Sequence, residues 1–216
     1  MVFAVEVRPA ATRDVPDVRP FERQPERGRL DDLLLALKHH TREAHERLER
    51  SLNLLGEPRR ALRFRHVLER FFGFHLVWEE CIAAAPSLRD FHRPRRRLAA
   101  LRQDLKSLGR SDSEIANLPS CPTAADLVRC EAEALGSLYV MEGSTLGGKV
   151  IGRAIEGAAW LPMGGIRYFD PYGPRTGEMW RGFKDWLVRQ PQAADRDGVL
   201  CGARNTFELL RAWTTS

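Results

Sequence analysis

The sequence predicts an all-α protein with a single folded domain, and three observations support this prediction. Apolar residues recur at helical spacing over most of the chain from about Leu30 onward. No two segments alternate apolar and polar residues as paired strands do, and the chain lacks the βαβ rhythm of a parallel sheet. Prolines and glycines separate the helical stretches at short intervals. We therefore expect a bundle of roughly seven helices with short connections.

Residues 1–28 are expected to form a flexible extension that is not part of the fold. They hold four of the thirteen prolines, Arg, Asp and Glu fill the intervals, and no apolar periodicity occurs. The folded domain is therefore predicted at residues 29–216, a length that is sufficient for one sizeable hydrophobic core.

The first predicted helix begins near Leu30 and ends at the Gly-Glu-Pro sequence of residues 56–58. Its apolar stripe consists of Leu30, Leu34, Leu37, Thr41, Ala44, His45, Leu48 and Leu52. The second helix, at 61–85, is rich in aromatic residues and is stopped by Pro86. A basic helix is expected to follow at about 93–108.

A long helix is then predicted from a cap at Thr123 to about Ala159, and it passes through a glycine-rich stretch. The segment 161–177 is rich in Gly, Pro and Tyr and is expected to be a loop. Two further helices are expected, at about 177–190 and 193–213.

Composition sets broad limits on the class of protein. Hydrophobic residues make up 43% and charged residues 29% of the chain, values that are typical of soluble proteins. No apolar run approaches the roughly 18 residues of a membrane span, and the N-terminus lacks the order of a secretory signal. The four cysteines form no C-x-x-C pair, so reduced thiols are expected. A cytoplasmic location without membrane attachment is therefore predicted.

The basic segment, residues 93–110, stands out because it contains seven Arg or Lys residues and one Asp. It is interpreted either as a solvated helix face or as a docking surface for nucleic acid, anionic lipid or an acidic protein. The segment has no interleaved aromatic residues for base stacking, and the chain has no recognised nucleic-acid motif. Nucleic acid is therefore not expected as a partner.

The glycine-rich stretch "YVMEGSTLGGKVIG" (139–152) needs an explanation, because each of its first three glycines costs a helix up to about 1 kcal/mol relative to alanine. The pattern disfavours a phosphate loop here, since Val150 occupies the hydroxyl position and the preceding segment is expected to be helical. Ser144 lacks the G-x-S-x-G setting of a hydrolase. No histidine has Glu three residues before it, which disfavours a carboxylate-bridged di-iron site.

His45 lies on the apolar stripe of the first predicted helix, with Lys38 two turns earlier on the same face. It is either a core histidine with a satisfied hydrogen bond or an iron ligand. Gly143 and Gly147 share one face of their helix and leave its backbone bare, while Gly148 permits a bend. A histidine on one helix and a bare helix opposite would suit a flat macrocycle that contains iron.

The chain resembles the haem oxygenase family. "LKHHTREAHERLE" (37–49) and "YVMEGSTLGGKVIG" (139–152) are similar to the proximal and distal helices of that family, most closely to its bacterial branch, which includes enzymes paired with bacteriophytochromes. "TGEMW" (176–180) and "NTFELLRAW" (205–213) are similar to the C-terminal helices. The resemblance covers about 30–213.

The resemblance implies an all-α haem-oxygenase-like bundle with haem held between a proximal helix and a kinked distal helix. Haem, iron protoporphyrin IX, would be both cofactor and substrate. O2 and an external electron donor would convert it to biliverdin, CO and Fe(II), either to supply a bilin chromophore to a phytochrome or to release iron. A ferredoxin or a flavoprotein reductase would donate the electrons. The basic segment, with Arg95, Arg96 and Arg97, would then meet an acidic donor.

The resemblance also implies roles for individual residues. His45 would ligate the iron, with Glu49 as its acidic neighbour, and Lys38 and Lys184 would contact the propionates. Thr41 and Phe207 complete the predicted haem contacts, together with Gly143, Gly147 and Gly148. Gly143, Ser144 and Gly147 are the predicted catalytic residues of the distal helix.

Ser144 is a departure from the family pattern. Mammalian members have an Asp at this point, which anchors water, whereas Ser144 cannot carry that charge. Bacterial relatives also lack the Asp, so the serine is not interpreted as inactivation.

Two alternatives to the enzyme stay open. One is a haem carrier or sensor that does not degrade haem; such a protein often uses two axial ligands, and Met141 is expected to point away from Gly143. The other is a relative with the same fold that acts on a different small molecule, as thiamin-degrading proteins do. That function would require a nucleophilic cysteine in the pocket.

Overall fold

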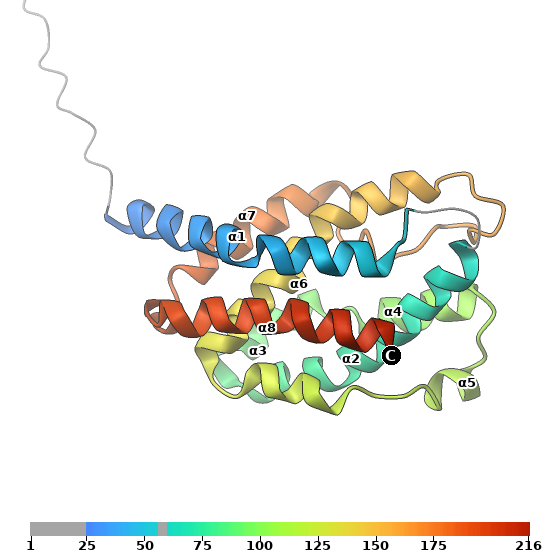
Figure 1. Ribbon diagram of the computed structural model, residues 1–216, viewed down its shortest axis with the longest axis horizontal. Coiled ribbons are helices and arrows are strands. Elements are labelled where there is room, and N and C mark those ends of the chain that lie inside the picture. Colours follow the sequence, from blue (N-terminus) through green and yellow to red (C-terminus); the bar gives the residue numbers. More distant parts are fainter. Residues whose placement is uncertain (1–24, 56–59) are drawn as a thin grey trace, which may run out of the picture.

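The computed structural model describes the backbone of residues 25–55 and 60–216, and every regular element in these ranges is helical (Figure 1). The all-α prediction is confirmed. The α-helices are α1 (Pro25–Leu52), α2 (Arg60–Ala84), α3 (Pro86–His92), α4 (Leu98–Ser107), α5 (Asp112–Ala116), α6 (Glu131–Ile155), α7 (Thr176–Leu187) and α8 (Arg196–Thr215). Short 3₁₀ helices are η1 (Arg93–Arg95), η2 (Pro122–Val128), η3 (Gly173–Arg175) and η4 (Pro191–Ala194).

Helix α8 organises the bundle, because it packs along both α1 and α6, and these two contacts are the most extensive in the molecule (Figure 1). The close approach of α8 to α6 depends on glycine. A Cβ at Gly136 would lie 2.0 Å from the carbonyl oxygen of Val199, and a Cβ at Gly202 would lie 2.1 Å from that of Glu133. These two glycines let the helix backbones meet directly.

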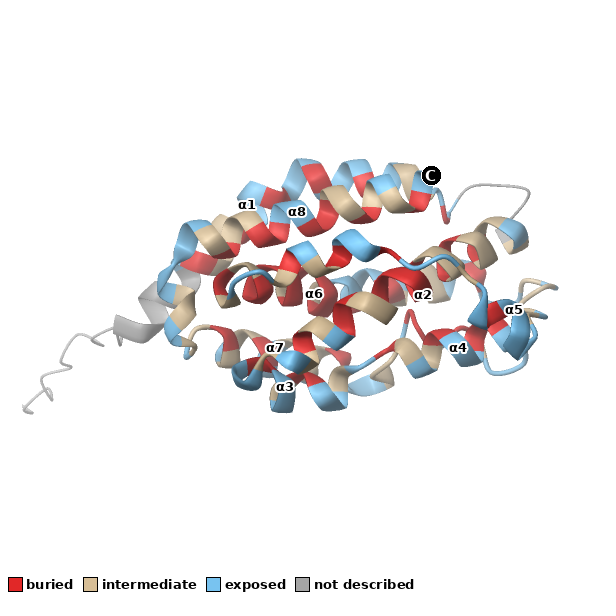
Figure 2. Ribbon diagram, turned by 90° about the horizontal axis from the view of Figure 1, so that it is seen from below, coloured by how far each residue is buried: buried red, intermediate tan, exposed pale blue. Residues whose placement is uncertain are grey.

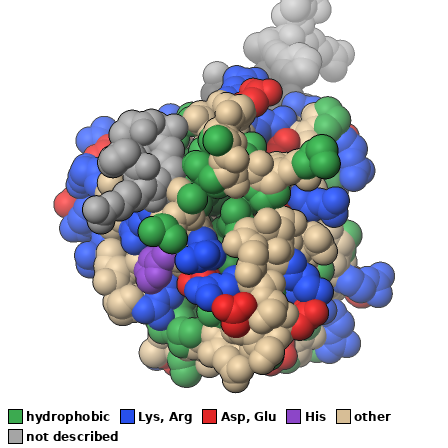
Figure 3. Space-filling model, turned by 90° about the vertical axis from the view of Figure 1, so that its right-hand side faces the viewer, with side chains coloured by type: hydrophobic (Ala, Val, Ile, Leu, Met, Phe, Trp, Pro, Cys, Tyr) green, Lys and Arg blue, Asp and Glu red, His purple; other side chains and the backbone are tan. Residues whose placement is uncertain are grey.

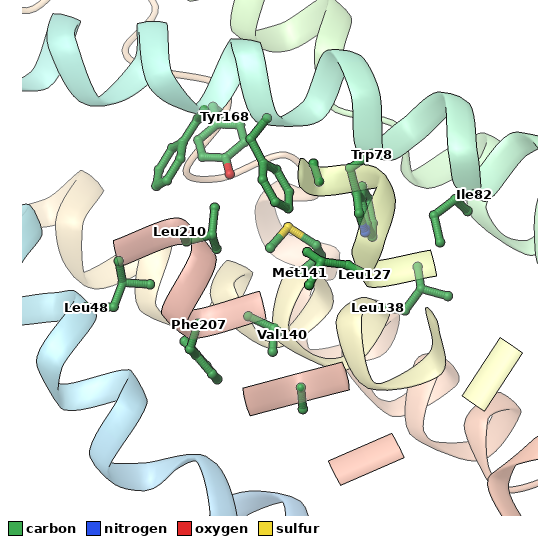
Figure 4. Close-up of a cluster of buried hydrophobic side chains, with 14 of the residues drawn as sticks. Leu48, Trp78, Ile82, Leu127, Leu138, Val140, Met141, Tyr168, Phe207 and Leu210 are labelled. Atoms are coloured by element: carbon green, nitrogen blue, oxygen red, sulfur yellow. The ribbon is translucent and has the colours of Figure 1, made fainter. Parts of the chain in front are cut away.

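The buried faces of the helices point toward a common interior (Figure 2). Phe74 and Trp78 of α2 stack there with ring centroids 6.0 Å apart, and the indole N–H of Trp78 donates a 2.8 Å hydrogen bond to Ser137 of α6. Figure 4 shows a buried cluster to which α1, α2, α6 and α8 all contribute. Among the described helices, none has both the length and the apolar character needed to cross a membrane.

The start of the fold differs from the prediction. Helix α1 begins at Pro25, so residues 25–28 belong to the first helix and not to the extension predicted at 1–28. Proline suits the first turn of a helix, where its missing N–H has no partner to lose. Residues 1–24 and the predicted turn at 56–58 lie outside the described residues.

The long glycine-rich helix begins later than predicted, because Thr123 does not cap it. Thr123 lies in η2, and α6 starts at Glu131. Cys130 forms the cap: its backbone is extended, and its sulfur atom accepts a hydrogen bond from the N–H of Glu133. Acidic residues in this first turn complement the helix dipole. Helix α6 then continues through Gly143, Gly147 and Gly148 as an α-helix and ends at Ile155, before the predicted end at Ala159.

The basic helix predicted at 93–108 is also interrupted. The turn η1 is followed by Arg96 and Arg97 in non-helical positions, and α4 starts only at Leu98. The carboxylate of Glu79 in α2 explains this break, since it accepts the backbone N–H of Arg97 at 2.7 Å and that of Leu98 at 3.0 Å. The cap of α4 is therefore a side chain from another helix, which turns Arg97 toward the interior.

Candidate functional site: a pocket between α1 and α6

A cavity of about 450 Å³ lies between α1 and α6 and is closed by residues of α2, α7, α8 and the segment 168–169. Its volume falls in the range of small-molecule and cofactor sites, and its lining is mainly apolar and aromatic. Helix α1 contributes Lys38, Thr41, His45 and Glu49 to the lining. Helices α6 and α8 contribute Gly143, Ser144, Gly147 and Phe207. Eight of the ten residues predicted for the site therefore meet in one pocket.

His45 is accessible in this pocket and is not a core histidine. Its side chain is 52% exposed, and its Nε2 lies 3.2 Å from a carboxylate oxygen of Glu49, one turn further along α1. Its ring contacts Phe207 of α8 with centroids 5.2 Å apart. Thr41 fills the neighbouring position on the stripe and donates its hydroxyl proton to the carbonyl of Leu37 at 2.7 Å. The imidazole of His45 thus contacts Glu49 and Phe207 and remains open to a ligand.

The opposite wall is formed by the glycine-rich part of α6. Gly143 and Gly147 lie four residues apart on the pocket face, as the sequence predicted. A Cβ at Gly147 would meet no atom within 4 Å, and a Cβ at Gly143 would only touch the ring of Trp180 at 3.7 Å. Packing within the protein does not require glycine at either position. Their absent side chains leave room on the pocket side.

Ser144 lies between these glycines, and its hydroxyl is held by two groups. The hydroxyl donates to the carbonyl of Met141 at 2.7 Å and accepts a 3.1 Å hydrogen bond from the guanidinium of Arg97. A second N–H of Arg97 donates to the same Met141 carbonyl. Arg97 is only 3% exposed and lies 3.4 Å from Glu142. The Glu142 carboxylate also accepts the hydroxyl proton of Tyr172 at 2.9 Å.

The geometry agrees with the comparison of the chain with known proteins. Residues 31–216 match the family model described as "Heme oxygenase". The chain belongs to the haem oxygenase family. A protein named "Heme oxygenase" from Xanthomonas campestris pv. campestris (strain 8004) is 38% identical over 119 residues, a match that covers 52% of this chain. The match covers 64% of that relative, which is less than two thirds of its length.

Two solved structures of the haem oxygenase family have the same fold. The structure of haem oxygenase from Leptospira interrogans superposes with a TM-score of 0.69 at 19% identity, and covers 85% of this chain and 98% of its own. The crystal structure of haem oxygenase-1 from the cyanobacterium Synechocystis sp. PCC6803 in complex with heme superposes with a TM-score of 0.67 at 17% identity. That superposition covers 84% of this chain and 90% of the cyanobacterial protein.

Two predicted site residues do not line the pocket of this haem oxygenase homologue. Gly148 is not among the lining residues, and a Cβ there would lie 1.9 Å from the carbonyl oxygen of Phe169. Gly148 therefore allows α6 to pack against the loop at Phe169. Lys184 of α7 lies over the ring of Trp180, with its ammonium 5.9 Å from the ring centroid. Trp180 lines the pocket, and Lys184 does not.

Met141 was expected to lie near the site and to point away from Gly143. It is buried and is one of the residues that line the same pocket. Figure 4 shows it between Tyr168 and the cluster of Val140, Phe207 and Leu210.

Several lining residues escaped prediction, including Arg42, Phe71, Tyr139 and Trp180. Trp180 lies within the "TGEMW" motif that carries the family resemblance, so this motif could have indicated it. Arg42 lies four residues after Lys38 on α1, and helical spacing could have placed it on the same side.

A buried polar chain behind the pocket was also missed. Tyr168 is a lining residue, and its hydroxyl lies 3.1 Å from Nε2 of His75. Nδ1 of His75 lies 3.1 Å from a carboxylate oxygen of Glu79. Burial raises the pKa of Glu79, but hydrogen bonds from His75, the Arg97 backbone and Arg96 outweigh it and lower the pKa to about 2. Burial also lowers the pKa of His75. An ionised Glu79 fixes the neutral His75 as a donor to Glu79 and an acceptor from Tyr168.

The basic segment 93–110 is only partly exposed. Four of its seven cations, Arg93, Arg96, Arg102 and Lys106, lie at the surface as the sequence indicated, whereas Arg95 and Arg97 do not. The side chains of Arg95 and Arg97 are 10% and 3% exposed, and both lie 3.4 Å from Glu142. Arg96 is half exposed and donates to Glu79 at 3.0 Å. The predictions of a solvated helix face and of a docking surface are both wrong for Arg95 and Arg97, because both cations lie against the one buried carboxylate of Glu142.

Proposed function

We propose that this member of the haem oxygenase family binds haem in the pocket between α1 and α6 and, with O2 and an external electron donor, degrades it to biliverdin, CO and Fe(II). The observation that carries the proposal is the pairing of an open His45 on α1 with the bare backbone of Gly143 and Gly147 on α6, in one apolar cavity. When bound, haem supplies the iron that activates O2.

The residues present fit this group. His45 would hold the iron through an imidazole nitrogen, with Glu49 as its nearest acceptor. Lys38 and Arg42 line the same side of the pocket and would hold the acidic substituents of the ring. Trp180, Phe207 and Leu210 exclude water from the cavity. Lys184 is not given a role in this scheme, because it does not line the pocket.

The partners of the reaction are further parts of the proposal. Electrons would come from a ferredoxin or a flavoprotein reductase, and the bilin would pass to a bacteriophytochrome or be discarded after iron release. On the face seen in Figure 3, Lys and Arg form several separate groups with acidic and apolar residues between them. An acidic donor would be guided by exposed cations such as these and not by Arg95 and Arg97, which are buried. A cytoplasmic location stays a prediction.

The test is to add haem to the purified chain and then a reductant under air. Loss of the Soret band together with a growing biliverdin band supports the enzyme, and a stable bound-haem spectrum without CO release contradicts it. His45→Ala should abolish normal ligation and turnover, because no other imidazole lines the described pocket. His39→Ala is the matched control, since His39 is an exposed residue of α1 outside the pocket lining.

One observation favours a second candidate, a haem carrier or sensor that does not degrade its ligand. Met141 lines the pocket, and a methionine sulfur as a second axial ligand would close the position that O2 requires. The ferric and ferrous spectra of the haem-loaded protein separate the two functions. A spectrum of six-coordinate iron that Met141→Leu converts to that of five-coordinate iron supports the carrier, and a spectrum that Met141→Leu leaves unchanged contradicts it.

A further inference from the structure

The distal wall of the pocket contains a buried cation that the proposed function does not use. Arg97 lies in the break before α4 and does not line the pocket. Its side chain is only 3% exposed. Its guanidinium donates to the Ser144 hydroxyl and to the Met141 carbonyl, both on α6. Burial alone would lower the pKa of Arg97, but Glu142, then Tyr168 and Tyr172, raise it. Arg97 is therefore always charged.

The hydrogen bonds fix which atoms Ser144 presents to the pocket. Its hydroxyl proton is directed to the Met141 carbonyl, and one lone pair of its oxygen accepts the N–H of Arg97. One lone pair of the oxygen remains, and Ser144 is an exposed residue of the pocket lining. Ser144 thus offers an acceptor to the pocket and not a proton.

The net charge behind this wall is positive. Glu142 is shared by two cations, since it lies 3.4 Å from both Arg97 and Arg95. Glu79, which accepts the backbone N–H of Arg97, is paired with Arg96. Arg95 stacks over the ring of Phe91 at 3.9 Å and makes no contact with Ser144 in the described interactions. Of the two cations, Arg97 is the one connected to the pocket.

We propose that Arg97 is a positioning residue of this site. It fixes Ser144 as a hydrogen-bond acceptor for a water molecule on the pocket wall, and it places a permanent positive charge one side chain away from that water. The fixed charge favours the loss of a proton from that water molecule. This inference rests on the proposed function only in its assumption that the pocket binds haem.

The test follows the visible spectrum of the ferric haem-loaded protein as pH rises. Arg97→Met removes the charge, so the midpoint of the spectral change should rise by about one pH unit. Arg97→Lys keeps the charge but loses the two-pronged contact with α6, so it should shift the midpoint less than Arg97→Met and no further than Ser144→Ala does. Arg96→Met is the matched control, because Arg96 donates to Glu79 and makes no contact with Ser144 in the described interactions. A midpoint that Arg97→Met leaves unchanged, or that Arg96→Met raises equally, overturns the proposal.

Ser144→Ala tests whether Arg97 acts through Ser144. It should change the midpoint in the wild-type background and have little further effect beside Arg97→Lys, because the two-pronged guanidinium contact is already lost there. Equal effects of Ser144→Ala in both backgrounds overturn the positioning role. Because Arg97→Lys keeps the buried charge, the comparison of Ser144→Ala in the two backgrounds still tests the proposal if Arg97→Met does not fold.

The inference and the proposed function fail in different ways. Haem that binds but is not degraded contradicts the proposed function and leaves the pH titration intact. If haem does not bind, a double-mutant cycle of Arg97→Lys and Ser144→Ala on urea unfolding of the haem-free protein decides whether Arg97 holds Ser144. Non-additive changes support the contact, and strictly additive changes overturn it.

Discussion

At the scale of single residues, two adjacent glycines of α6 have different purposes. A Cβ at Gly147 would meet open space, whereas a Cβ at Gly148 would lie 1.9 Å from the carbonyl oxygen of Phe169. Gly147 therefore keeps a pocket wall bare, and Gly148 lets α6 pack against backbone. The same residue type thus leaves the pocket wall open at one position and permits close packing at the next.

Alanine substitutions at these two positions give a matched pair. Gly148→Ala should lower the free energy of unfolding by about 1–3 kcal/mol, because backbone must move to admit the methyl group. Gly147→Ala should preserve stability or raise it by up to about 1 kcal/mol through helix propensity, and should weaken haem binding. Urea unfolding of the haem-free protein and haem titration measure the two effects. An equal loss of stability in both variants contradicts the assignment.

The sequence predicts the residues whose position depends on helical spacing alone. His45 and Lys38 share a face of α1, and Gly143, Ser144 and Gly147 share a face of α6, so a period of 3.6 residues brings each set to the pocket. The position of Arg97 depends on Glu79, which is 18 residues earlier and lies on another helix. No local pattern in the basic segment reports that contact.

At the scale of elements, the junction before α4 depends on one carboxylate. Glu79 accepts two backbone N–H groups at the start of α4, a side-chain hydrogen bond from His75 and one from Arg96. The predicted basic helix is broken here because capping by Glu79 replaces helical hydrogen bonds, and the break turns Arg97 toward Ser144. The geometry of the distal wall thus depends on α2 through a single side chain.

Removal of this carboxylate should destabilise the protein strongly. Glu79→Ala leaves buried N–H groups and a buried histidine without their partner, and should lower the free energy of unfolding by about 3–5 kcal/mol. Glu80→Ala, at the exposed neighbouring position, should change it by less than about 0.5 kcal/mol. Chemical denaturation compares the two variants. A cost for Glu79→Ala as small as that for Glu80→Ala would show that the cap is not needed.

At the scale of the whole molecule, α8 holds α1 and α6 at the separation that forms the pocket. Gly136 and Gly202 set the contact of α6 with α8, while Arg47 of α1 donates to Glu208 of α8 at 2.7 Å. The all-α class was predictable because amphipathic periodicity encodes it. The close contact of α6 with α8 was not, because isolated glycines on two helices do not reveal which helices meet.

The stability of the whole fold should depend on pH through its buried histidines. Burial lowers the pKa of His92 from 6.5 to about 4, and burial also lowers that of His75. Between pH 6.5 and about pH 4, His92 binds a proton in the unfolded chain and not in the folded chain, so acidification favours unfolding. Glu79, with its pKa lowered from 4.5 to about 2, adds a further loss of stability below about pH 4.5.

We therefore expect the free energy of unfolding of the haem-free protein to fall by on the order of 3 kcal/mol from about pH 7 to about pH 4. Urea titrations across this range measure the slope. His92→Gln should flatten the slope, whereas His39→Gln, at an exposed position of α1, should leave it unchanged. A free energy that does not change with pH down to about 4 would contradict the burial of neutral histidines.

The most direct measurement of the central claim is CO release from haem added to the reduced protein in air. The wild type and His39→Ala should release CO and form biliverdin, His45→Ala should not, and added imidazole should restore the haem spectrum of His45→Ala by filling the space of the lost side chain. Equal CO release by the wild type and by His45→Ala without imidazole would contradict the assignment of His45 and of the pocket between α1 and α6.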